Sequence, residues 1–454
     1  MGERSEAAED QAVRDGSAVY SVEAAIAATE EVPPGCVRTE VGVTPEDWQV
    51  QKIGALAQIK RGASPRPIAD SKWFHTKSEI GWLRISDVAR EGKFIRATDQ
   101  SLSDAGVARS RLVRPGNVVM SMAATVGRPA INRKTVCIHD GFVVFENAAV
   151  SSEFLYYLLL AIEDGWAERG QTGSQVNLNT HIISSTPVVL PATEAEQSAI
   201  ATALSDADAL IESLDRLIAK KRDIKQAAMQ QLLTGQTRLA GFTGEWSKFN
   251  FSEHAILKAR IGWQGLRTDE YLRSGDYCLV TGTDFENGSI NWNGCYFVDR
   301  WRYEQDKNIQ LTEGDVLLTK DGTIGKVGFV DSLPSPATLN SGVYVVRPVG
   351  NAFEPKFIFY VFESTIFGEF LRKLQAGSTI SHLYQKDFVG FSFSAPNIKE
   401  QAAIATVLSD MDAEIEVLER RRDKARQIKQ GMMQQLLTGR VRLVETTDPS
   451  RECT

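Results

Sequence analysis

The sequence predicts an α+β protein in which two mixed α/β globular domains alternate with two long helices that pair as a coiled coil. Two observations predict this arrangement. A helical segment occurs twice in the chain, almost unchanged, and similar short strands and helices precede each copy in the same order. With 454 residues, 43% of them hydrophobic and 24% charged, the chain has the composition of a folded protein of about two to four domains.

The duplicated segment covers residues 197–239 and 401–443, which align at a constant offset of 204 without a gap. Of the 43 aligned positions, 28 are identical, so the similarity is not accidental. The two cores read AIATALSDADA and AIATVLSDMDA, and MQQLLTG recurs near the end of both copies. We infer that the segment is a repeat with the same structure in both halves.

Each copy predicts one helix of about 40 residues, which is about 60 Å long at 1.5 Å per residue. Thr193 followed by Glu196 matches a capping box at a helix start, and Asn397 followed by Glu400 is its counterpart. Each copy has a glycine close to its end, and many helices end at a glycine in the left-handed conformation. These glycines are Gly235 and Gly439.

Apolar residues recur along both helices in steps of four and three, the spacing of a coiled-coil seam. A narrow seam on so long a helix needs a partner, and the other copy is the obvious one. The alternative is that each helix packs separately on its own globular domain. The seam residues are Ile200, Leu204, Ile211, Leu214 and Ile218 in the first copy and Ile404, Leu408, Ile415 and Leu418 in the second.

The globular stretches before the helices are related more weakly. PGNVVMSMAATVG (115–127) matches EGDVLLTKDGTIG (313–325), which predicts a strand followed by a glycine-containing turn. FLYYLLL (154–160) matches FIFYVFE (357–363), an apolar run that predicts a helix. The expected boundaries are an acidic N-terminal extension (1–43), a first globular domain (44–192), a first helix (193–239), a second globular domain (240–396), a second helix (397–443) and a C-terminal tail (444–454).

The net charge of −7 conceals an uneven distribution. Residues 1–47 hold 3 basic and 11 acidic residues, whereas residues 52–134 hold 16 basic and 6 acidic ones. The basic stretch could neutralise phosphates, although a solvated basic surface is the alternative. Residues 245–395 hold 15 basic and 18 acidic residues, so the second domain shows no comparable excess.

Motifs of catalysis and cofactor binding are missing from the sequence. We find no phosphate-binding loop, no dinucleotide fingerprint and no N-P-P-[FY] motif of methyltransferases. The five histidines stand apart from one another, so we expect no metal site. Five scattered cysteines without paired spacing favour a reduced, cytoplasmic protein, and no apolar run approaches the ~18 residues that span a membrane. We therefore expect a chain that is not an enzyme by itself.

The order of modules resembles the DNA-specificity (S) subunit of type I restriction-modification systems. The resemblance rests on two diverged domains alternating with two repeated helices that carry QQLLTG, and on strings such as LVTGTDFENG (279–288) and GDVLLTKDGTIGKVG (314–328). It covers about residues 40–443. It implies two target-recognition domains, each reading one half of a bipartite, asymmetric DNA site, and an antiparallel helix pair that sets the spacing.

The resemblance also implies partners. Two methyltransferase (M) subunits would dock on the helices, and two restriction/translocase (R) subunits could join them. S-adenosylmethionine and ATP with magnesium would be bound by those subunits, and this chain would hold no cofactor.

Candidate DNA-binding residues follow from polar and basic side chains in glycine-containing loops, which suit close approach to a DNA groove. An ordinary surface turn or a helix cap is the alternative for each of these loops. In the first domain the candidates are Lys60, Arg61, Ser64 and Arg66 in KRGASPRP, Thr125 and Arg128 in the turn, and Gly173, Ser174 and Gln175 in QTGSQVNLN. In the second domain they are Arg260, Trp263, Gln264 and Arg267, then Lys320, Thr323 and Lys326, and finally Gly377, Ser378 and Thr379.

Two other functions remain open on the sequence. A coiled-coil scaffold whose globular domains bind proteins would lack salt-dependent DNA binding. A self-sufficient methyltransferase would transfer methyl groups when purified alone, which the missing motifs argue against.

Overall fold

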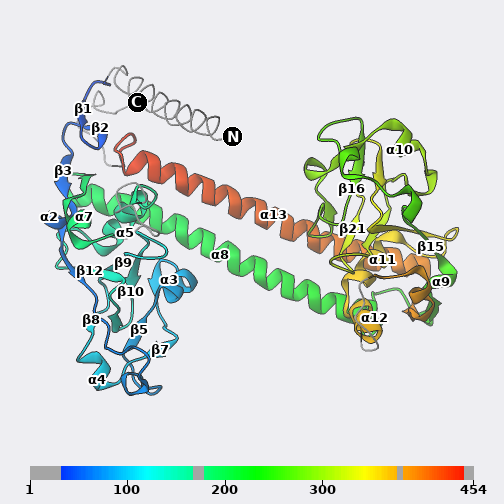
Figure 1. Cartoon of the computed structure of the whole chain (residues 1–454), viewed down its shortest axis with the longest axis horizontal. Helices are drawn as coiled ribbons and strands as arrows, with labels where there is room; N and C mark the ends of the chain where they lie inside the picture. The colour runs from blue at the N-terminus through cyan, green and yellow to red at the C-terminus, as the bar shows by residue number, and fades with distance from the viewer. Residues whose placement is uncertain (1–31, 167–177, 376–381, 444–454) are drawn as a thin grey trace, which may run out of the picture. The chain divides into compact units, whose positions relative to one another are not determined.

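The structure is a computed structural model that describes residues 32–166, 178–375 and 382–443 (Figure 1). The chain divides into two compact units. Unit 1 comprises Met1–Ser213 and Arg422–Thr454, and unit 2 comprises Leu214–Arg421. Each unit contains one globular domain and a part of both long helices, α8 (Glu194–Leu233) and α13 (Ile398–Leu436). In the described ranges, no helix is both long and apolar enough to cross a membrane.

The long helices begin one residue after the predicted caps. The side-chain oxygen of Thr193 accepts a hydrogen bond from the Glu196 N–H at 3.3 Å, and that of Asn397 accepts one from Glu400 at 3.2 Å. The helices end at Leu233 and Leu436, before the predicted residues 239 and 443. Gly235 and Gly439 both have a φ of +72°, so the chain turns there through the left-handed conformation that glycine favours.

Within each unit the two helix segments run antiparallel. In unit 2, Arg222 pairs with Glu419 while Lys225 pairs with Asp412 at 2.6 Å, so numbers rise on one helix as they fall on the other. In unit 1, Asp208 pairs with Lys429 at 2.6 Å and Glu196 pairs with Arg442. The predicted fold class, mixed globular domains with an antiparallel helix pair, is confirmed.

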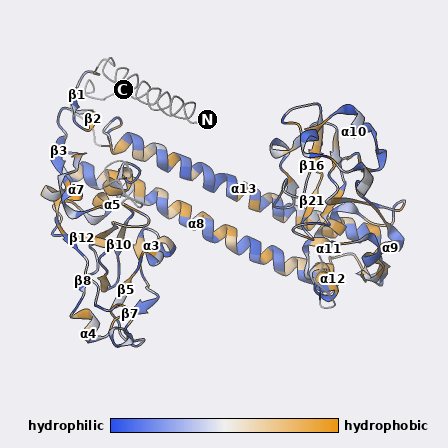
Figure 2. Ribbon diagram, in the orientation of Figure 1, coloured by the Kyte–Doolittle hydropathy of each residue, from blue (hydrophilic) through white to orange (hydrophobic). Residues whose placement is uncertain are grey.

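The proposed seam has two parts. Ile200 and Leu204 belong to the core of the first globular domain, and Ile404 and Leu408 to that of the second, so each helix begins by packing on its own domain. Leu214, Ile218 and Ile415 are buried farther along, and Ile211 and Leu418 are half-buried. Figure 2 shows both helices as largely hydrophilic ribbons with apolar residues at intervals.

The globular domain of unit 1 is built on a five-stranded sheet of order β4-β12-β9-β10-β6 and a four-stranded sheet of order β7-β5-β11-β8. Small antiparallel pairs, β1-β2 and β3-β13, complete it. Its strands are β1 (Cys36–Thr39), β2 (Gly42–Pro45), β3 (Gln49–Lys52), β4 (Gln58–Arg61), β5 (Gly81–Leu83), β6 (Phe94–Ile95), β7 (Gln100–Ser101), β8 (Arg111–Val113), β9 (Val118–Ser121), β10 (Pro129–Asn132), β11 (Val136–Ile138), β12 (Phe142–Glu146) and β13 (Pro187–Leu190). Its helices are α2 (Ile53–Leu56), η1 (Ser71–Trp73), α3 (Ile85–Glu91), α4 (Asp104–Val107), α5 (Ser152–Ala161) and α7 (Thr180–Ser185).

The globular domain of unit 2 repeats this plan with a four-stranded sheet, β15-β23-β20-β21, and a three-stranded sheet, β19-β16-β22. The pairs β14-β24 and β17-β18 complete it. Its strands are β14 (Ser247–Asn250), β15 (Ala255–Lys258), β16 (Tyr277–Val280), β17 (Phe285–Glu286), β18 (Ser289–Ile290), β19 (Tyr296–Val298), β20 (Val316–Thr319), β21 (Val327–Phe329), β22 (Ala337–Leu339), β23 (Val343–Pro348) and β24 (Ser392–Ala395). Its helices are α9 (Phe251–His254), η2 (Gly262–Gln264), η3 (Thr268–Glu270), η4 (Trp292–Gly294), α10 (Arg300–Glu304), η5 (Lys307–Ile309), α11 (Pro355–Glu363), α12 (Thr365–Gln375) and η6 (Gln385–Gly390).

The repeated apolar runs form the helices that cover the main sheets. As predicted, residues 154–160 lie in α5, which packs on β9 and β10, and residues 357–363 lie in α11, which packs on β20 and β21. All four residues of β9 are buried, because Val118 and Met120 face the core under α5 while Val119 faces the core of the second sheet. This double burial holds the turn that follows β9 at a fixed place.

The cysteines depart from the expected reduced state at one position. Cys36 is disulfide-bonded, whereas Cys137, Cys278 and Cys295 are free and buried. The expectation of unpaired cysteines is therefore wrong for Cys36, because spacing along the sequence does not reveal which thiols meet in the fold.

Candidate nucleic-acid interface

Three segments of unit 1 meet at one end of the main sheet, where β4 and β9 end and β12 begins. The N–H of Gly62 donates to the carbonyl oxygen of Phe142 at 2.8 Å, and the N–H of Met122 donates to that of Gly141 at 2.8 Å. The sheet thus brings the predicted loop KRGASPRP (60–67), of which residues 61–66 carry most of the candidates, beside the turn that follows β9.

The loop 61–66 is organised by Asp140, which the sequence did not single out. Ser64 Oγ donates to Asp140 Oδ1 at 2.6 Å, and Arg66 donates to Oδ2 at 2.8 Å. Arg61 Nε donates to the Asp140 carbonyl oxygen at 2.9 Å. The Ser64 hydrogen bond is the main reason why the pKa of Asp140 lies below its usual value. Asp140 therefore holds Ser64 and Arg66 through its carboxylate and Arg61 through its main-chain oxygen, in one exposed cluster.

Lys60 does not share this cluster. Its ammonium pairs with Glu146 of the neighbouring strand β12 at 2.6 Å. Because successive side chains of a strand point to opposite faces, Lys60 and Arg61 project to opposite sides of the sheet. Arg111 joins the cluster instead, since its Nε donates to the Arg61 carbonyl oxygen at 2.8 Å.

Gly62 is required by the close approach of two backbones. A Cβ atom at this position would lie 2.0 Å from the carbonyl oxygen of His139. The glycine of KRGASPRP therefore serves the packing of the loop against the start of β12, before any role toward a ligand.

The turn after β9 contains Thr125 and Arg128. The Thr125 carbonyl oxygen accepts a hydrogen bond from Ser121, and Arg128 pairs with Glu163 at 2.8 Å. The other predicted loop meets this turn, because the Leu178 N–H donates to the Met122 carbonyl oxygen at 3.2 Å. The candidates Gly173, Ser174 and Gln175 lie outside the described residues.

The corresponding turn of unit 2 follows β20 and is held in the same way. The Leu383 N–H donates to the Lys320 carbonyl oxygen at 2.9 Å, and His382 pairs with Asp321 at 2.6 Å. The Thr323 carbonyl oxygen accepts from Thr319 at 2.5 Å, and Lys326 Nζ donates to the Gly282 carbonyl oxygen at 3.2 Å. The candidates Gly377, Ser378 and Thr379 lie outside the described residues.

The segment that follows β15 differs from its counterpart in unit 1 and corrects two predictions. Arg260 is only 1% exposed, and its guanidinium donates to the Leu339 carbonyl oxygen at 2.9 Å and to Thr338 at 3.2 Å. Gln264 is also buried. Both side chains stabilise the domain interior, so we remove them from the set of groups that could contact DNA. Arg267 is exposed, and Trp263 lies in η2.

The two domains thus place different chemistry on a shared frame. Unit 1 presents an exposed cluster around Asp140, and the equivalent position before β23 in unit 2 holds Ser341, whose hydroxyl donates to Asn340 Oδ1 at 3.0 Å. A signal for both positions exists in the sequence, because each stands directly before the glycine of the repeated strings GFVV (141–144) and GVYVV (342–346). Throughout the described ranges, no group of three or more potential metal ligands occurs.

Comparison with known proteins identifies the family that shares this fold. A family model described as "Type I restriction modification DNA specificity domain" matches residues 45–220 and 263–427, about three quarters of the chain. The chain belongs to this family. The specificity subunit of the type I restriction enzyme MjaVIII of Methanocaldococcus jannaschii is 21% identical over 417 residues, covering 88% of this chain and 94% of that protein. The putative MjaX specificity subunit of the same organism is 21% identical over 428 residues, with 89% and 96% covered.

Solved specificity subunits share the fold. A type I restriction-modification S subunit from M. genitalium matches with a TM-score of 0.57 and 12% identity, covering 89% of this chain and 98% of that one. A chain from a study of type I restriction-modification complex assembly matches with a TM-score of 0.55 and 16% identity, covering 87% and 99%. This chain is thus a type I specificity subunit, and its role is recognition of DNA within a restriction-modification system.

Proposed function

We propose that each globular domain of this specificity subunit reads one half of a bipartite, asymmetric DNA site. The observation that carries the proposal is the different set of side chains at the same end of the same sheet. The cluster of Arg61, Ser64 and Arg66 in unit 1 has no equivalent at Arg260, which points inward. Two domains with the same fold but different side chains at the same position are suited to recognise two different half-sites.

The proposed contacts combine phosphate and base recognition. The first domain presents three exposed or half-buried cations beside its polar loop, namely Arg61, Arg66 and Arg111. Guanidinium groups of this kind can bind phosphate or the edge of guanine. In unit 2 the proposed contacts are Arg267, Lys320, Thr323 and Lys326. We keep Lys60, Thr125 and Arg128 as candidates, although Lys60 and Arg128 already have carboxylate partners.

A domain exchange tests the proposal. Residues 45–195 would be replaced by the matching domain of a relative, and the methylated sequence would be mapped across a host genome. We expect one half of the methylated site to change and the other half to persist. A change in both halves would refute independent reading.

We further propose that the long helices set the spacing of the half-sites and dock two methyltransferase subunits, with two restriction/translocase subunits as further partners. Support comes from apolar side chains on the helix surface. Leu210, Leu217 and Ile224 recur every seven residues along α8 and are 43%, 38% and 43% exposed. An exposed apolar stripe on a helix is typical of a surface that another protein covers.

The docking proposal is tested by co-purification with the cognate modification subunit. We expect Leu217→Gln with Ile224→Gln to weaken the complex, because both changes remove apolar surface from the stripe. The matched control is Ile256→Gln, a residue of β15 that is 39% exposed but lies outside the helices. If the natural chain, the double variant and the Ile256→Gln control all form the complex equally well, docking on this face is refuted.

Catalysis and cofactors then belong to the partners in this proposal. The specificity subunit would neither methylate nor cleave DNA alone, and S-adenosylmethionine and ATP with magnesium would be bound by the other subunits. The complex would act in the cytoplasm, where the cellular DNA lies. Adding the modification subunit to this chain should produce adenine methylation that neither subunit shows alone.

A further inference from the structure

A lysine ammonium of unit 1 lies in a cluster of hydroxyl and carboxylate groups where α5 meets α8. Lys93 Nζ donates to Tyr157 OH at 2.8 Å and to Ser205 Oγ at 2.9 Å, and it pairs with Glu153 at 2.5 Å. The Lys93 side chain is 10% exposed. These three groups match the three donors of an ammonium, so the charge is buried with its hydrogen bonds satisfied.

Unit 2 contains the tyrosine, serine and aspartate of this cluster, whereas the position of Glu153 is held by Lys356 and the nearby carboxylate is that of Glu363. Tyr360 OH donates to Asp412 Oδ2 at 2.8 Å and lies 3.1 Å from Ser409 Oγ. Lys225 pairs with Asp412 Oδ1 at 2.6 Å. The equivalent groups of unit 1, in the same order, are Tyr157, Asp208, Ser205 and Lys429.

The position of Lys93 is taken by a glycine in unit 2. In unit 1 the Ile131 N–H donates to the Lys93 carbonyl oxygen at 2.8 Å. In unit 2 the equivalent residue, Phe329, donates to the Gly288 carbonyl oxygen at 2.9 Å. Gly288 sits in the β17-β18 hairpin and carries no side chain, so nothing from this position reaches the acceptors.

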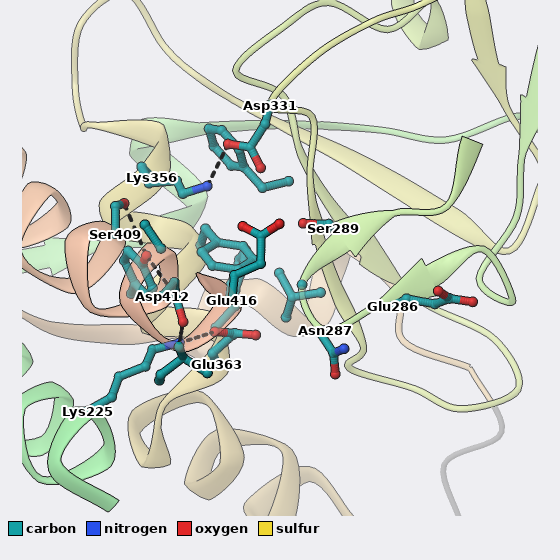
Figure 3. A pocket seen from close by; sticks show the side chains of 18 of the residues that line it. Lys225, Glu286, Asn287, Ser289, Asp331, Lys356, Glu363, Ser409, Asp412 and Glu416 are labelled. Atoms are coloured by element: carbon teal, nitrogen blue, oxygen red, sulfur yellow. Dashed lines mark hydrogen bonds and ion pairs between the residues drawn. The ribbon is translucent and has the colours of Figure 1, made fainter. Parts of the chain in front are cut away.

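A cavity of about 1460 Å³ opens where the Lys93 side chain would be. Figure 3 shows Glu363, Asp412 and Glu416 around it, with Asn287 and Ser289 of the hairpin on the other side. All lining residues belong to unit 2, and they include six acidic side chains against four basic ones. Three of the basic groups are already paired, because Lys225 pairs with Asp412 at 2.6 Å, Lys356 pairs with Asp331 at 2.8 Å and Arg222 pairs with Glu419.

Glu363 is a half-buried carboxylate of this cavity whose charge is only weakly compensated. Its Oε2 lies 3.7 Å from Lys225, which is closer to Asp412, and its side chain is 27% exposed. Burial raises the pKa of Glu363, and the neighbouring Asp412 adds to that rise. A further cation placed here would stabilise the carboxylate form.

We propose that this cavity receives a lysine side chain from a partner protein chain, whose ammonium pairs with Glu363 beside the tyrosine and serine hydroxyls that match those around Lys93 in unit 1. The inference rests on the proposed function, in which a methyltransferase subunit docks on the helices that form one wall of the cavity. Unit 1 supplies its own ammonium, so the proposed lysine enters only at unit 2. The two halves of the subunit would therefore present different surfaces to two copies of the same partner.

The chemistry of the cavity favours a protein lysine over other occupants. Its excess of carboxylates repels the phosphates of DNA. Phe329 and Phe359 line the cavity and can contact the aliphatic stem of a lysine, whereas Asn287 and Ser289 can bond to the main chain that carries it. The volume exceeds that of one ammonium many times, which suits a segment of protein.

The test measures the affinity of the full-length chain for its cognate modification subunit. Glu363→Gln keeps the shape of the side chain and removes the charge, so we expect binding that is roughly tenfold to hundredfold weaker, the loss typical of a hydrogen bond to a charged group. Carbodiimide, which couples carboxylates to amines in contact, should link Glu363 to a lysine of the partner, and mass spectrometry would identify that lysine.

The matched control is Glu153→Gln, which removes a carboxylate from the filled cluster of unit 1 and should leave partner affinity unchanged. Unchanged affinity of Glu363→Gln with no cross-link would overturn the inference, while binding that still depends on Leu217 and Ile224 would leave the docking proposal standing. Spermidine provides a further arm. If it raises the thermal stability of the isolated chain only when Glu363 is present, and partner affinity does not change, the occupant is a free polyamine and the protein lysine is refuted.

Discussion

The guanidinium of Arg238 forms a bidentate ion pair with the carboxylate of Glu400, which is completely buried. The two hydrogen bonds measure 2.5 and 2.6 Å. Arg442 binds the buried carboxylate of Glu196 in the same way in unit 1. The sequence suggested that these glutamates cap their own helices, but each instead binds an arginine that follows the end of the other long helix. In each unit, the same ion pair thus joins the start of one long helix to the segment that follows the end of the other.

Removing one partner of this pair should destabilise unit 2 strongly. Glu400→Gln leaves the Arg238 guanidinium half-buried without its carboxylate, and breaking a buried ion pair costs about 3–5 kcal/mol. Chemical denaturation measures the change in the free energy of unfolding. The control is Glu416→Gln, which removes an exposed pair with Arg420 and should cost less than about 1 kcal/mol. Equal effects of the two changes would show that the buried pair is not what holds the helix ends.

Gly62 should not tolerate even one added methyl group. In Gly62→Ala the new Cβ would meet the His139 carbonyl oxygen at 2.0 Å, and this oxygen is held in place by a hydrogen bond from the Phe142 N–H at 3.0 Å. We expect a loss of about 1–3 kcal/mol of stability, as for other overpacked sites, together with weaker DNA binding because the loop shifts. Gly262→Ala is the control, since a Cβ there meets nothing within 4 Å. Thermal unfolding and DNA affinity of both variants decide the matter.

Arg66 should contribute to DNA affinity. Its side chain is 72% exposed and is oriented by an ion pair with Asp140. Because this ion pair is exposed to solvent, exchanging it for a contact with nucleic acid costs little free energy. Arg66→Ala should weaken binding by about 1–3 kcal/mol if the guanidinium contacts a base, or lower the salt dependence by about one unit if it contacts a phosphate. The matched control is Arg300→Ala, an arginine of α10 that is 74% exposed. An unchanged affinity and an unchanged salt slope would exclude Arg66 from the interface.

Glu363 should make the isolated chain less stable as pH rises. The pKa of this carboxyl is raised by burial above its ordinary value of 4.5, with Asp412 of α13 adding to the rise and Lys225 of α8 and Lys356 of α11 opposing it. Below about pH 4.5 the carboxyl is neutral in both the folded and the unfolded chain, so it has no effect on stability. As the pH rises toward the raised pKa of the folded chain, the unfolded chain loses its proton first and the folded chain loses stability.

Glu363→Gln should therefore be more stable than the natural chain at neutral pH, and the difference should vanish as the pH falls below 4.5. Unfolding free energies between pH 4 and 8 measure this, with the exposed Glu369→Gln as the control. A variant that is less stable at neutral pH would mean that the ion pair with Lys225 outweighs the cost of burial.

The sequence was sufficient for features that depend on local pattern. Heptad spacing, helix caps and the repeated apolar runs identified α8, α13, α5 and α11, because these patterns report the buried face, the start and the full burial of a helix respectively. The turns after β9 and β20 followed from the same comparison of the two halves. Such features need no knowledge of which distant strands meet.

Features that depend on distant contacts could not be predicted. Arg260 follows a strand and belongs to a polar loop, which favours exposure, yet it is buried by Thr338 and Leu339 of β22. Asp140 is an acidic residue outside the basic loop, and it becomes central only because β12 lies beside β4. Lys93 gave no signal until the two halves were compared in space.

A whole-heptad insertion into both helices tests whether they set the spacing between half-sites. The structure indicates where to insert. The pairs of Lys221 with Glu414 and Arg222 with Glu419 must stay intact in unit 2, and that of Asp208 with Lys429 in unit 1. Insertions between Ser213 and Leu214 and between Arg421 and Arg422 satisfy both conditions, because they fall at the boundary of the two units. Seven residues preserve the face that each helix turns toward its partner.

Seven added residues lengthen each helix by about 10 Å at 1.5 Å per residue, and the rise of duplex DNA is about 3.4 Å per base pair. The unspecified spacer of the methylated site should therefore grow by up to about three base pairs, while the half-sites stay the same because the reading loops are untouched. A four-residue insertion at the same places is the control, and it should be tolerated less well because it rotates the seam out of phase. Genome-wide mapping of methylation reads both quantities. An active heptad variant with the original spacer would show that the helices are not the ruler, and their near-identity would then have to come from docking the same partner twice.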